Sequence, residues 1–427
     1  DEFRQQGHAV VEWIARYLEN IETFPVKSGV KPGDIRNALP ELPPTGSESF
    51  DLFLRDFDNI IIPGVTHWQS PNFFAYFPAN SSPPSVLAEM LTAAIGAQCM
   101  VWETSPAAAE LEERMMEWLR VMTGLPEGFE GVIQDSASSA TLAALITARE
   151  KTTGFRSNRE GLREAGRLRI YASAQAHSSV EKGAGVAGFG RENLVRVAVK
   201  NDYSIDPAAL ENEITKDIAA GFIPCCVVAS MGTTGTTAVD PLRPTGEICR
   251  KHGLWLHVDA ALGGTALLLP EMRWMADGIE YADSFVFNPH KWMFTNFDCS
   301  AYFVRDAASL IRTFEILPEY LKTRTRGQVN DYRDWGIPLG RRFRALKLWA
   351  VIRTYGVERL QSMIREHIRL AKMLAGMIEA EKDFELMAPV PLNTVCFRYK
   401  PQGRTDEELN RLNEKLNHLL NDTGMIY

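Results

Sequence analysis

Apolar residues recur at helical spacing near both ends of the chain. Near the start they are Val10, Ile14, Leu18 and Ile21. This period predicts an amphipathic helix, whose apolar face must cover the main domain or a second subunit. Near the end, Thr405 and Glu408 have the spacing of a capping box and precede a leucine stripe, which predicts a last helix.

Between residues 83 and 305, helical stretches alternate with short apolar runs. The helical stretches include 107–123 and 139–150, and the apolar runs include 225–230, 254–258 and 284–287. Short, continuously apolar strands between helices predict an α/β fold with a mainly parallel sheet covered on both faces. Ligands of such sheets bind at the carboxyl ends of the strands.

The pattern divides the chain into three segments. Residues 1–82 form an N-terminal helical segment that includes a Pro- and Gly-punctuated connection, and residues 83–348 form the large domain. Residues 349–427 hold a long helical region, a strand over 392–400 and the last helix, which predicts a small C-terminal α+β domain. Residues 425–427 look like the beginning of a strand, so we expect this domain to continue beyond them.

Composition and charge narrow the class of protein. The 427 residues are 45% hydrophobic and 23% charged, which is ordinary globular composition. The net charge of −8 makes nucleic acid and anionic membranes unexpected partners. No uninterrupted apolar run approaches the roughly 18 residues of a membrane-spanning helix. The six cysteines form no C-x-x-C pair, which favours reduced thiols and a cytoplasmic location.

Chemically useful side chains follow three of the apolar runs. Asp259 follows 254–258, the sequence Asn-Pro-His-Lys ending in Lys291 follows 284–287, and a stretch of Gly and Thr follows 225–230. Upstream, residues 135–141 open a predicted helix, whose free N–H groups and dipole favour a phosphate. A lysine, an acid and a phosphate site at one sheet edge suggest pyridoxal phosphate (PLP). The lysine would form a Schiff base with the aldehyde, and the acid would keep the pyridine nitrogen protonated.

Taken singly, these residues have plainer explanations. Asp259 could be a turn residue, Lys291 a solvated surface lysine, and the serine-rich stretch a simple helix cap. His257, Asp259 and His290 could instead suggest a metal site, but their spacing matches no usual zinc pattern and no fourth ligand presents itself, so no metal is expected. The joint occurrence at successive strand ends favours the cofactor.

Several motifs resemble the group II PLP-dependent decarboxylases. Residues 288–292, Asn-Pro-His-Lys-Trp, resemble the lysine signature of that family, as do residues 257–261, His-Val-Asp-Ala-Ala. Residues 64–78, 175–179 and 337–344 are similar to the aromatic-L-amino-acid decarboxylase branch in particular. The resemblance covers nearly the whole chain. It implies PLP fold type I and a homodimer with active sites at the subunit interface, with the N-terminal segment wrapped on the partner.

The resemblance also implies roles for individual residues. Lys291 matches the Schiff-base lysine, Asp259 the acid paired with the pyridine nitrogen, and His177 the imidazole stacked on the cofactor. Tyr320 lies in a stretch that resembles the catalytic loop. Further matches to the cofactor neighbours are Ala137, Ser138, Thr234, Asn288 and His290, and matches to the substrate pocket are Trp68, Phe77, Pro78, His177 and Gly340. Core packing is the alternative for Trp68, and a surface position is the alternative for Tyr320.

The implied activity is a lyase reaction, the decarboxylation of an aromatic L-amino acid to its arylalkylamine and CO₂. Tryptophan, tyrosine, DOPA, 5-hydroxytryptophan and phenylalanine all fit. An aromatic aldehyde synthase of the same family is the alternative, but such enzymes typically replace the loop tyrosine or the stacking histidine, and this chain keeps Tyr320 and His177. A silent scaffolding relative would be expected to lose Lys291 or Asp259. An aminotransferase would usually show an arginine for the α-carboxylate, which the sequence does not reveal.

A few positions depart from the family pattern and leave the pocket shape open. They are Ala79, Gln98 and Met100. Gly340 stands where some phenol- or imidazole-preferring relatives carry serine, so we expect room for indolic side chains and poor turnover of histidine.

Overall fold

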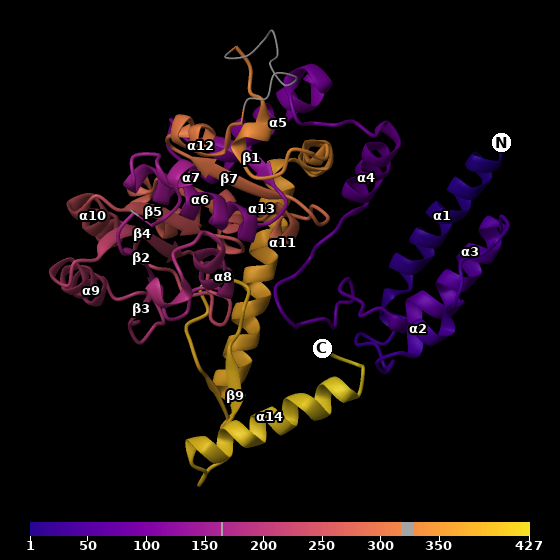
Figure 1. Cartoon of the computed structure of the whole chain (residues 1–427). Coiled ribbons are helices and arrows are strands. Elements are labelled where there is room, and N and C mark those ends of the chain that lie inside the picture. Colours follow the sequence, from indigo (N-terminus) through magenta and orange to yellow (C-terminus); the bar gives the residue numbers. More distant parts are fainter. Residues whose placement is uncertain (164, 317–327) are drawn as a thin grey trace. The chain divides into compact units, whose positions relative to one another are not determined.

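The computed structural model describes residues 1–163, 165–316 and 328–427 (Figure 1). The chain separates into two units, which are described one at a time. One unit combines Asp1–Ala79 with Tyr399–Tyr427, and the other spans Asn80–Arg398. The three-segment division at residues 82 and 348 remains a prediction.

A seven-stranded sheet lies at the centre of the described part of the unit Asn80–Arg398, in the order β1-β7-β6-β5-β4-β2-β3. Neighbouring strands from β6 to β3 pair in parallel, and β7 runs antiparallel to both β6 and β1. The carboxyl ends of β1, β2, β4, β5 and β6 therefore meet at one edge. The strands are β1 (Glu130–Gln134), β2 (Leu168–Ser173), β3 (Leu194–Val197), β4 (Ile223–Ser230), β5 (Trp255–Asp259), β6 (Ser284–Phe287) and β7 (Ser300–Val304). The predicted α/β class with a mainly parallel sheet is confirmed.

Helices pack on this sheet as the alternating pattern predicted. The predicted helices 107–123 and 139–150 correspond to α5 and α6; α6 packs against β4 to β7, and α5 packs against β1. Small residues on α6 allow this close approach, and Ala140, Ala144 and Leu145 are all fully buried. The helices of this unit are α4 (Pro83–Ile95), α5 (Pro106–Thr123), α6 (Ala137–Thr152), α7 (Ser157–Glu160), α8 (Ser178–Val186), α9 (Pro207–Ala219), α10 (Leu242–His252), α11 (Pro289–Trp292), α12 (Ala307–Phe314) and α13 (Arg344–Ala380).

The long helical region and the strand after it differ in detail from the prediction. Gly356 has non-helical backbone angles (φ 70°, ψ 165°) and joins two helical stretches within α13. The strand predicted over 392–400 is shorter, because its partner β8 (Phe384–Leu386) has three residues and pairs only with β9 (Phe397–Tyr399). Leu392 is instead fully buried outside the strand.

The other unit joins the two ends of the chain. Its helices are α1 (Glu2–Glu19), α2 (Asp34–Ala38), α3 (Phe50–Asp56) and α14 (Asp406–Asp422). The predicted capping box is present, since the N–H of Glu408 donates to Thr405 Oγ1 and the N–H of Thr405 donates to Glu408 Oε2. No strand is assigned at residues 425–427. Tyr427 nevertheless bonds to one segment on both sides, since its N–H donates to the carbonyl oxygen of Asn72 (3.4 Å) and its carbonyl oxygen accepts the N–H groups of Phe74 (2.6 Å) and Ala75 (2.7 Å). The beginning of a strand there stays a prediction.

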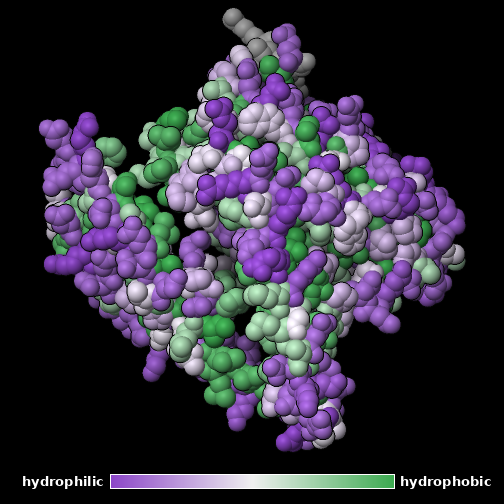
Figure 2. All heavy atoms as spheres, turned by 180° about the vertical axis from the view of Figure 1, so that it is seen from behind, coloured by the Kyte–Doolittle hydropathy of each residue, from purple (hydrophilic) through white to green (hydrophobic). Residues whose placement is uncertain are grey.

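Hydrophobic side chains remain at the surface of α1 and α4. No residue of α1 is buried, and α4 exposes Leu87, Leu91 and Ile95 by 53–59% at a spacing of four residues. Figure 2 shows green hydrophobic patches interrupting the purple polar surface. None of the helices in the described residues combines the length and apolar character that crossing a membrane requires.

Candidate active site

Asp259 is the last residue of β5 and lies within the carboxyl edge of the sheet. The N–H of Met231, which follows β4, donates to its carbonyl oxygen (2.8 Å), and the N–H of Ala260 donates to the carbonyl oxygen of Val286 in β6 (2.9 Å). The Asp259 side chain is 8% exposed and accepts the N–H of Ala261 at Oδ1 (3.1 Å). The carboxylate is therefore fixed between the ends of β4 and β6.

Lys291 reaches the same edge from the next strand. β6 ends at Phe287, and the N–H of Asn288 donates to the carbonyl oxygen of Ala261 (3.0 Å), which ties this turn to the residues that follow Asp259. Lys291 lies on the short helix α11. Burial lowers the pKa of its amine, and the nearby charge of Asp259 opposes that shift. A lysine with a lowered pKa is more often uncharged, which is the form that attacks an aldehyde.

The first turn of α6 supplies free N–H groups. Ser136 is its N-cap, and the Ser136 hydroxyl accepts the N–H of Ser139 (3.2 Å). Ala137 is buried and Ser138 is exposed, and the first N–H groups of a helix have no partner within it. Thr141 Oγ1 lies 3.3 Å from His257 Nε2 of β5, so this turn lies over the strand that ends in Asp259. The arrangement suits a phosphate.

His177 is the N-cap of α8, which follows β2. Its ring is exposed, and Nδ1 lies 2.8 Å from Ser179 Oγ and accepts the N–H of Ser179 (3.2 Å). Because a backbone N–H can only donate, Nδ1 must be the acceptor, and the proton of the neutral ring must be on Nε2. The structure therefore gives His177 a fixed orientation and an N–H donor at the outer end of the ring.

Thr234 lies on the exposed part of the loop after β4. Beneath it, Thr233 Oγ1 lies 3.0 Å from Thr236 Oγ1, and Asp240 is fully buried. The Asp240 carboxylate accepts the N–H of Ser230 (2.7 Å) and that of Ile205 (2.6 Å), and burial raises its pKa to about 7. Sequence reasoning missed Asp240, although a single acidic residue in an otherwise uncharged stretch was a signal.

His257 and His290, the histidines of the metal alternative, are engaged in hydrogen bonds. His257 is fully buried between Thr141 Oγ1 and Ser284 Oγ (2.9 Å), and His290 Nδ1 accepts the N–H of Cys299 (2.9 Å). Burial lowers the pKa of each imidazole to about 4. Both are therefore neutral rings that support the strands and the Lys291 turn.

Gly340 lines a cavity of about 110 Å³ together with Asp135, the residue before the α6 cap. A Cβ at Gly340 would lie 3.3 Å from Gln98 Nε2, and Gln98 Oε1 accepts the N–H of Arg341 (2.7 Å). The Arg341 guanidinium is buried against Glu112 (2.6 Å). Sequence reasoning missed this ion pair, which fixes the backbone beside Gly340.

The remaining predicted residues belong either to the other unit or to the part of the chain that the structure does not describe. Trp68, Phe77 and Pro78 belong to the other unit, where the Trp68 ring stacks on Tyr76 at 5.8 Å and is 40% exposed. Tyr320 lies outside the described residues. The roles of these four residues, like those of the other predicted site residues, stay predictions.

Comparison with known proteins gives the family. The model of the pyridoxal-dependent decarboxylase conserved domain matches residues 32–400. Tyrosine decarboxylase 4 of Petroselinum crispum is 42% identical, and the match covers 100% of this chain and 86% of that protein. Phenylacetaldehyde synthase of Arabidopsis thaliana is 44% identical, and the match covers 100% of this chain and 88% of that protein. The crystal structure of Oryza sativa TDC with PLP and tryptamine superposes with a TM-score of 0.97 at 37% identity. The superposition covers 100% of this chain and 90% of that chain.

The chain therefore belongs to the pyridoxal-dependent decarboxylases, and its cofactor is pyridoxal 5'-phosphate. The residues present fit that group. One sheet edge carries a lysine amine of lowered pKa, a fixed and largely buried carboxylate, and an open helical turn. These match the aldehyde, the ring nitrogen and the phosphate of PLP respectively.

Proposed function

We propose that the protein removes the α-carboxylate of aromatic L-amino acids and releases the arylalkylamine and CO₂. The observation that carries this proposal is the placement of Lys291 and Asp259 at the ends of the neighbouring parallel strands β5 and β6. The proposal of aromatic substrates is supported by the tyrosine decarboxylase of Petroselinum crispum, which is 42% identical over the whole chain.

In this proposal, each residue at the sheet edge has a separate task. When bound, PLP withdraws electrons from the bond that breaks. Lys291 holds the cofactor covalently, and Asp259 holds a proton on its ring nitrogen. The first turn of α6, with Ala137 and Ser138, binds the phosphate.

The proton that replaces CO₂ has two candidate donors. Tyr320 is the donor that the family resemblance implies. His177 carries its proton on Nε2, while Ser179 fixes the other side of the ring, so it can orient the cofactor and can also donate.

An aromatic aldehyde synthase is the second candidate, and one observation favours it. The phenylacetaldehyde synthase of Arabidopsis thaliana is 44% identical over the whole chain. Retention of His177 and Tyr320 supports decarboxylation without oxidation.

Product analysis tests the two functions. Purified holoenzyme is incubated with tryptophan, tyrosine, DOPA, 5-hydroxytryptophan, phenylalanine and histidine, and amine, aldehyde, peroxide and oxygen uptake are measured. Amine and CO₂ in equal amounts without oxygen uptake support decarboxylation. Aldehyde and peroxide with oxygen uptake support the synthase, and no product from any aromatic substrate refutes both.

The cofactor link has its own test. Borohydride should trap PLP covalently in the native protein and not in Lys291→Ala. The exposed Lys182 provides a matched control, since Lys182→Ala should trap normally. Trapping at another lysine in Lys291→Ala would refute the assignment.

We propose further that the protein is a cytoplasmic homodimer with active sites at the subunit interface. Free cysteines support the location, and the exposed Leu87, Leu91 and Ile95 of α4 support the assembly, since an obligate dimer buries about 2,000 Å² or more. Leu91→Lys should shift the protein toward monomer in sedimentation. Ile218→Lys, at an exposed position of α9, should leave it dimeric, and an active wild-type monomer would refute the proposal.

A further inference from the structure

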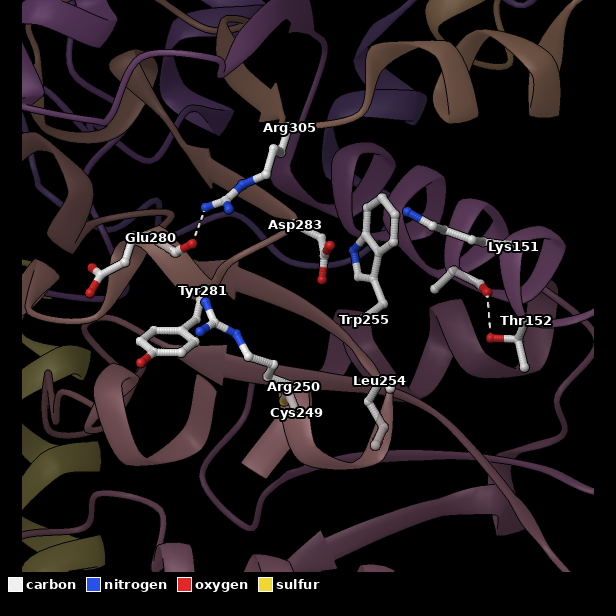
Figure 3. A pocket seen from close by; sticks show the side chains of 12 residues that line it. Lys151, Thr152, Cys249, Arg250, Leu254, Trp255, Glu280, Tyr281, Asp283 and Arg305 are labelled. Carbon is white, nitrogen blue, oxygen red and sulfur yellow. Dashed lines mark hydrogen bonds between the residues drawn. The ribbon is translucent and has the colours of Figure 1, made fainter. Parts of the chain in front are cut away.

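Figure 3 shows a cavity of about 360 Å³. It lies at the amino ends of β5 and β6, whereas Asp259 and Lys291 lie at or beyond their carboxyl ends. Its walls come from the end of α6, the end of α10, the start of β5 and the turn before β6. Trp255 of the cavity wall begins the strand that Asp259 ends, so β5 separates the two places. Among the described residues of the predicted active site, none lines this cavity.

Two guanidinium groups at this cavity lack a carboxylate partner among the described residues. Arg250 is stacked on the Tyr281 ring at 4.2 Å from its centroid. Arg305 donates to the carbonyl oxygen of Glu280, as the dashed line in Figure 3 shows. Lys151, by contrast, is paired with Asp306 at 3.1 Å. Guanidinium groups in fixed orientations favour a carboxylate or a phosphate.

One carboxyl group of the cavity also lacks an ion pair among the described residues. Asp283 Oδ2 accepts the N–H of Leu256 (2.8 Å), and Figure 3 places Asp283 between Arg305 and Trp255. Burial raises its pKa, while the charges of Lys151 and Arg305 oppose the shift. A purely anionic ligand would meet this acid as a like charge, and a purely cationic ligand would leave the guanidinium groups unmatched.

We propose that this cavity binds an α-amino acid as a zwitterion, with its carboxylate on Arg250 and Arg305 and its ammonium on Asp283. Leu254 lines the cavity and gives it an apolar wall for the ligand's side chain, beside the Trp255 ring, over which the Lys151 amine lies at 5.4 Å. This second site is independent of the chemistry proposed at Lys291.

Site-resolved hydrogen exchange on the full-length PLP-loaded protein tests the proposal. The probes are L-leucine, which carries both charges and no ring, and its analogues 4-methylpentanoate and 3-methylbutylamine, which carry one charge each. Millimolar L-leucine should slow exchange in residues 249–257 and 280–284. Each analogue should bind about tenfold or more weakly, because it leaves either the two guanidinium groups or the Asp283 carboxylate without its charged partner.

Variants on one helix make the test specific. Arg250→Gln should weaken L-leucine binding about tenfold or more, as should Asp283→Asn. Lys251→Gln is the matched control, because Lys251 is the next residue on α10 but pairs with Glu211 outside the cavity. If Arg250→Gln lowers thermal stability, Arg250→Lys is used in its place. Lysine keeps the positive charge but lacks the planar guanidinium group, so this variant should still bind L-leucine more weakly than wild type.

Three results would overturn the proposal. The first is that L-leucine does not slow hydrogen exchange in residues 249–257 and 280–284. The second is that either single-charge analogue binds as tightly as L-leucine. The third is that Lys251→Gln weakens L-leucine binding as much as Arg250→Gln does. Loss of binding in the variants with unchanged decarboxylation would support the second site, whatever the substrate at Lys291 proves to be.

Discussion

Asp259 opposes the effect of burial on Lys291, because its negative charge raises the pKa of an amine that burial lowers. The two residues come from strands that pair in parallel, with Asp259 opposite Val286 one residue before the end of β6. Their proximity therefore follows from the sheet, and the charge of Asp259 acts on the Lys291 amine before any ligand is bound.

Asp259→Asn should reduce kcat/KM by about 100-fold or more, because a neutral amide cannot hold the positive charge on the cofactor ring. The pKa of Lys291 should fall further, since the opposing charge is lost. Steady-state kinetics and the pH dependence of the cofactor absorbance check both effects. Asp277→Asn removes an exposed carboxylate paired with Arg243 and should have full activity. Near-normal activity of Asp259→Asn would contradict the assigned role.

Gly340→Ser should lower activity on tryptophan about tenfold relative to activity on tyrosine or DOPA. The added Cβ would lie 3.3 Å from Gln98 Nε2, which is tight, and the hydroxyl would take space from the cavity beside Asp135. Comparison of kcat/KM for the three substrates measures the effect.

Gln98→Ala combined with Gly340→Ser provides the control for this steric argument. Removing the amide that the new side chain meets should restore part of the tryptophan activity. Equal losses on tryptophan and tyrosine, or fast turnover of histidine by the wild type, would remove the argument.

The residues at the carboxyl ends of the strands could be predicted from the sequence, because local patterns determine where each strand ends. Short apolar runs end at Asp259, Phe287 and Ser230, and these ends meet in the structure. Contacts between distant segments could not be predicted in this way. The pairing of Arg341 with Glu112 joins residues 229 positions apart, and no local periodicity signals it.

The end of the chain shows the same limit. Residues 425–427 have strand-like side chains, but the sequence does not reveal which segment they bond to. The N–H of Tyr427 donates to Asn72, and its carbonyl oxygen accepts the N–H groups of Phe74 and Ala75, all far away in sequence. The capping box at Thr405 was predictable because both of its partners are local.

Asp240→Asn should remove a pH-dependent part of the stability. Burial raises the pKa of Asp240 from 3.8 to about 7, so the folded chain holds a proton that the unfolded chain releases above about pH 4. This contribution is fully present below the unfolded pKa and is lost as the pH rises through about 7. In the asparagine amide only the oxygen can accept a hydrogen bond, so one of the two N–H groups is left without a partner. This should lower the free energy of unfolding by about 1–3 kcal/mol.

Urea unfolding of wild type and variant at about pH 5 and pH 8 measures this difference. The destabilisation by Asp240→Asn should be larger at the lower pH, because the favourable protonation of Asp240 is then present in the wild type. Glu358→Gln, at an exposed position of α13, should show no such pH dependence. A deficit that grows with rising pH would contradict the sign of the shift.

Tyr320→Phe should change the product rather than the binding of the cofactor. The carbon that loses its carboxylate must receive a proton before oxygen reacts there, and a phenol O–H can deliver that proton. Phenylalanine keeps the ring and removes only the donor. Amine yield should therefore fall, while aldehyde, ammonia, peroxide and oxygen uptake rise together. Chromatography of the products and an oxygen electrode follow both branches, and absorbance checks that PLP is retained.

The role of His177 decides how this result is interpreted. Its Nδ1 accepts the N–H of Ser179, so its Nε2 carries a proton that could serve the same carbon. Tyr355→Phe, on α13, removes a phenol outside the predicted site and should change nothing. If Tyr320→Phe forms amine at the wild-type rate without oxygen uptake, the proton must come from elsewhere. Ser179→Ala keeps the backbone N–H bond to Nδ1 but removes the Ser179 Oγ contact (2.8 Å), so it should then slow amine formation if the orientation of Nε2 limits the transfer.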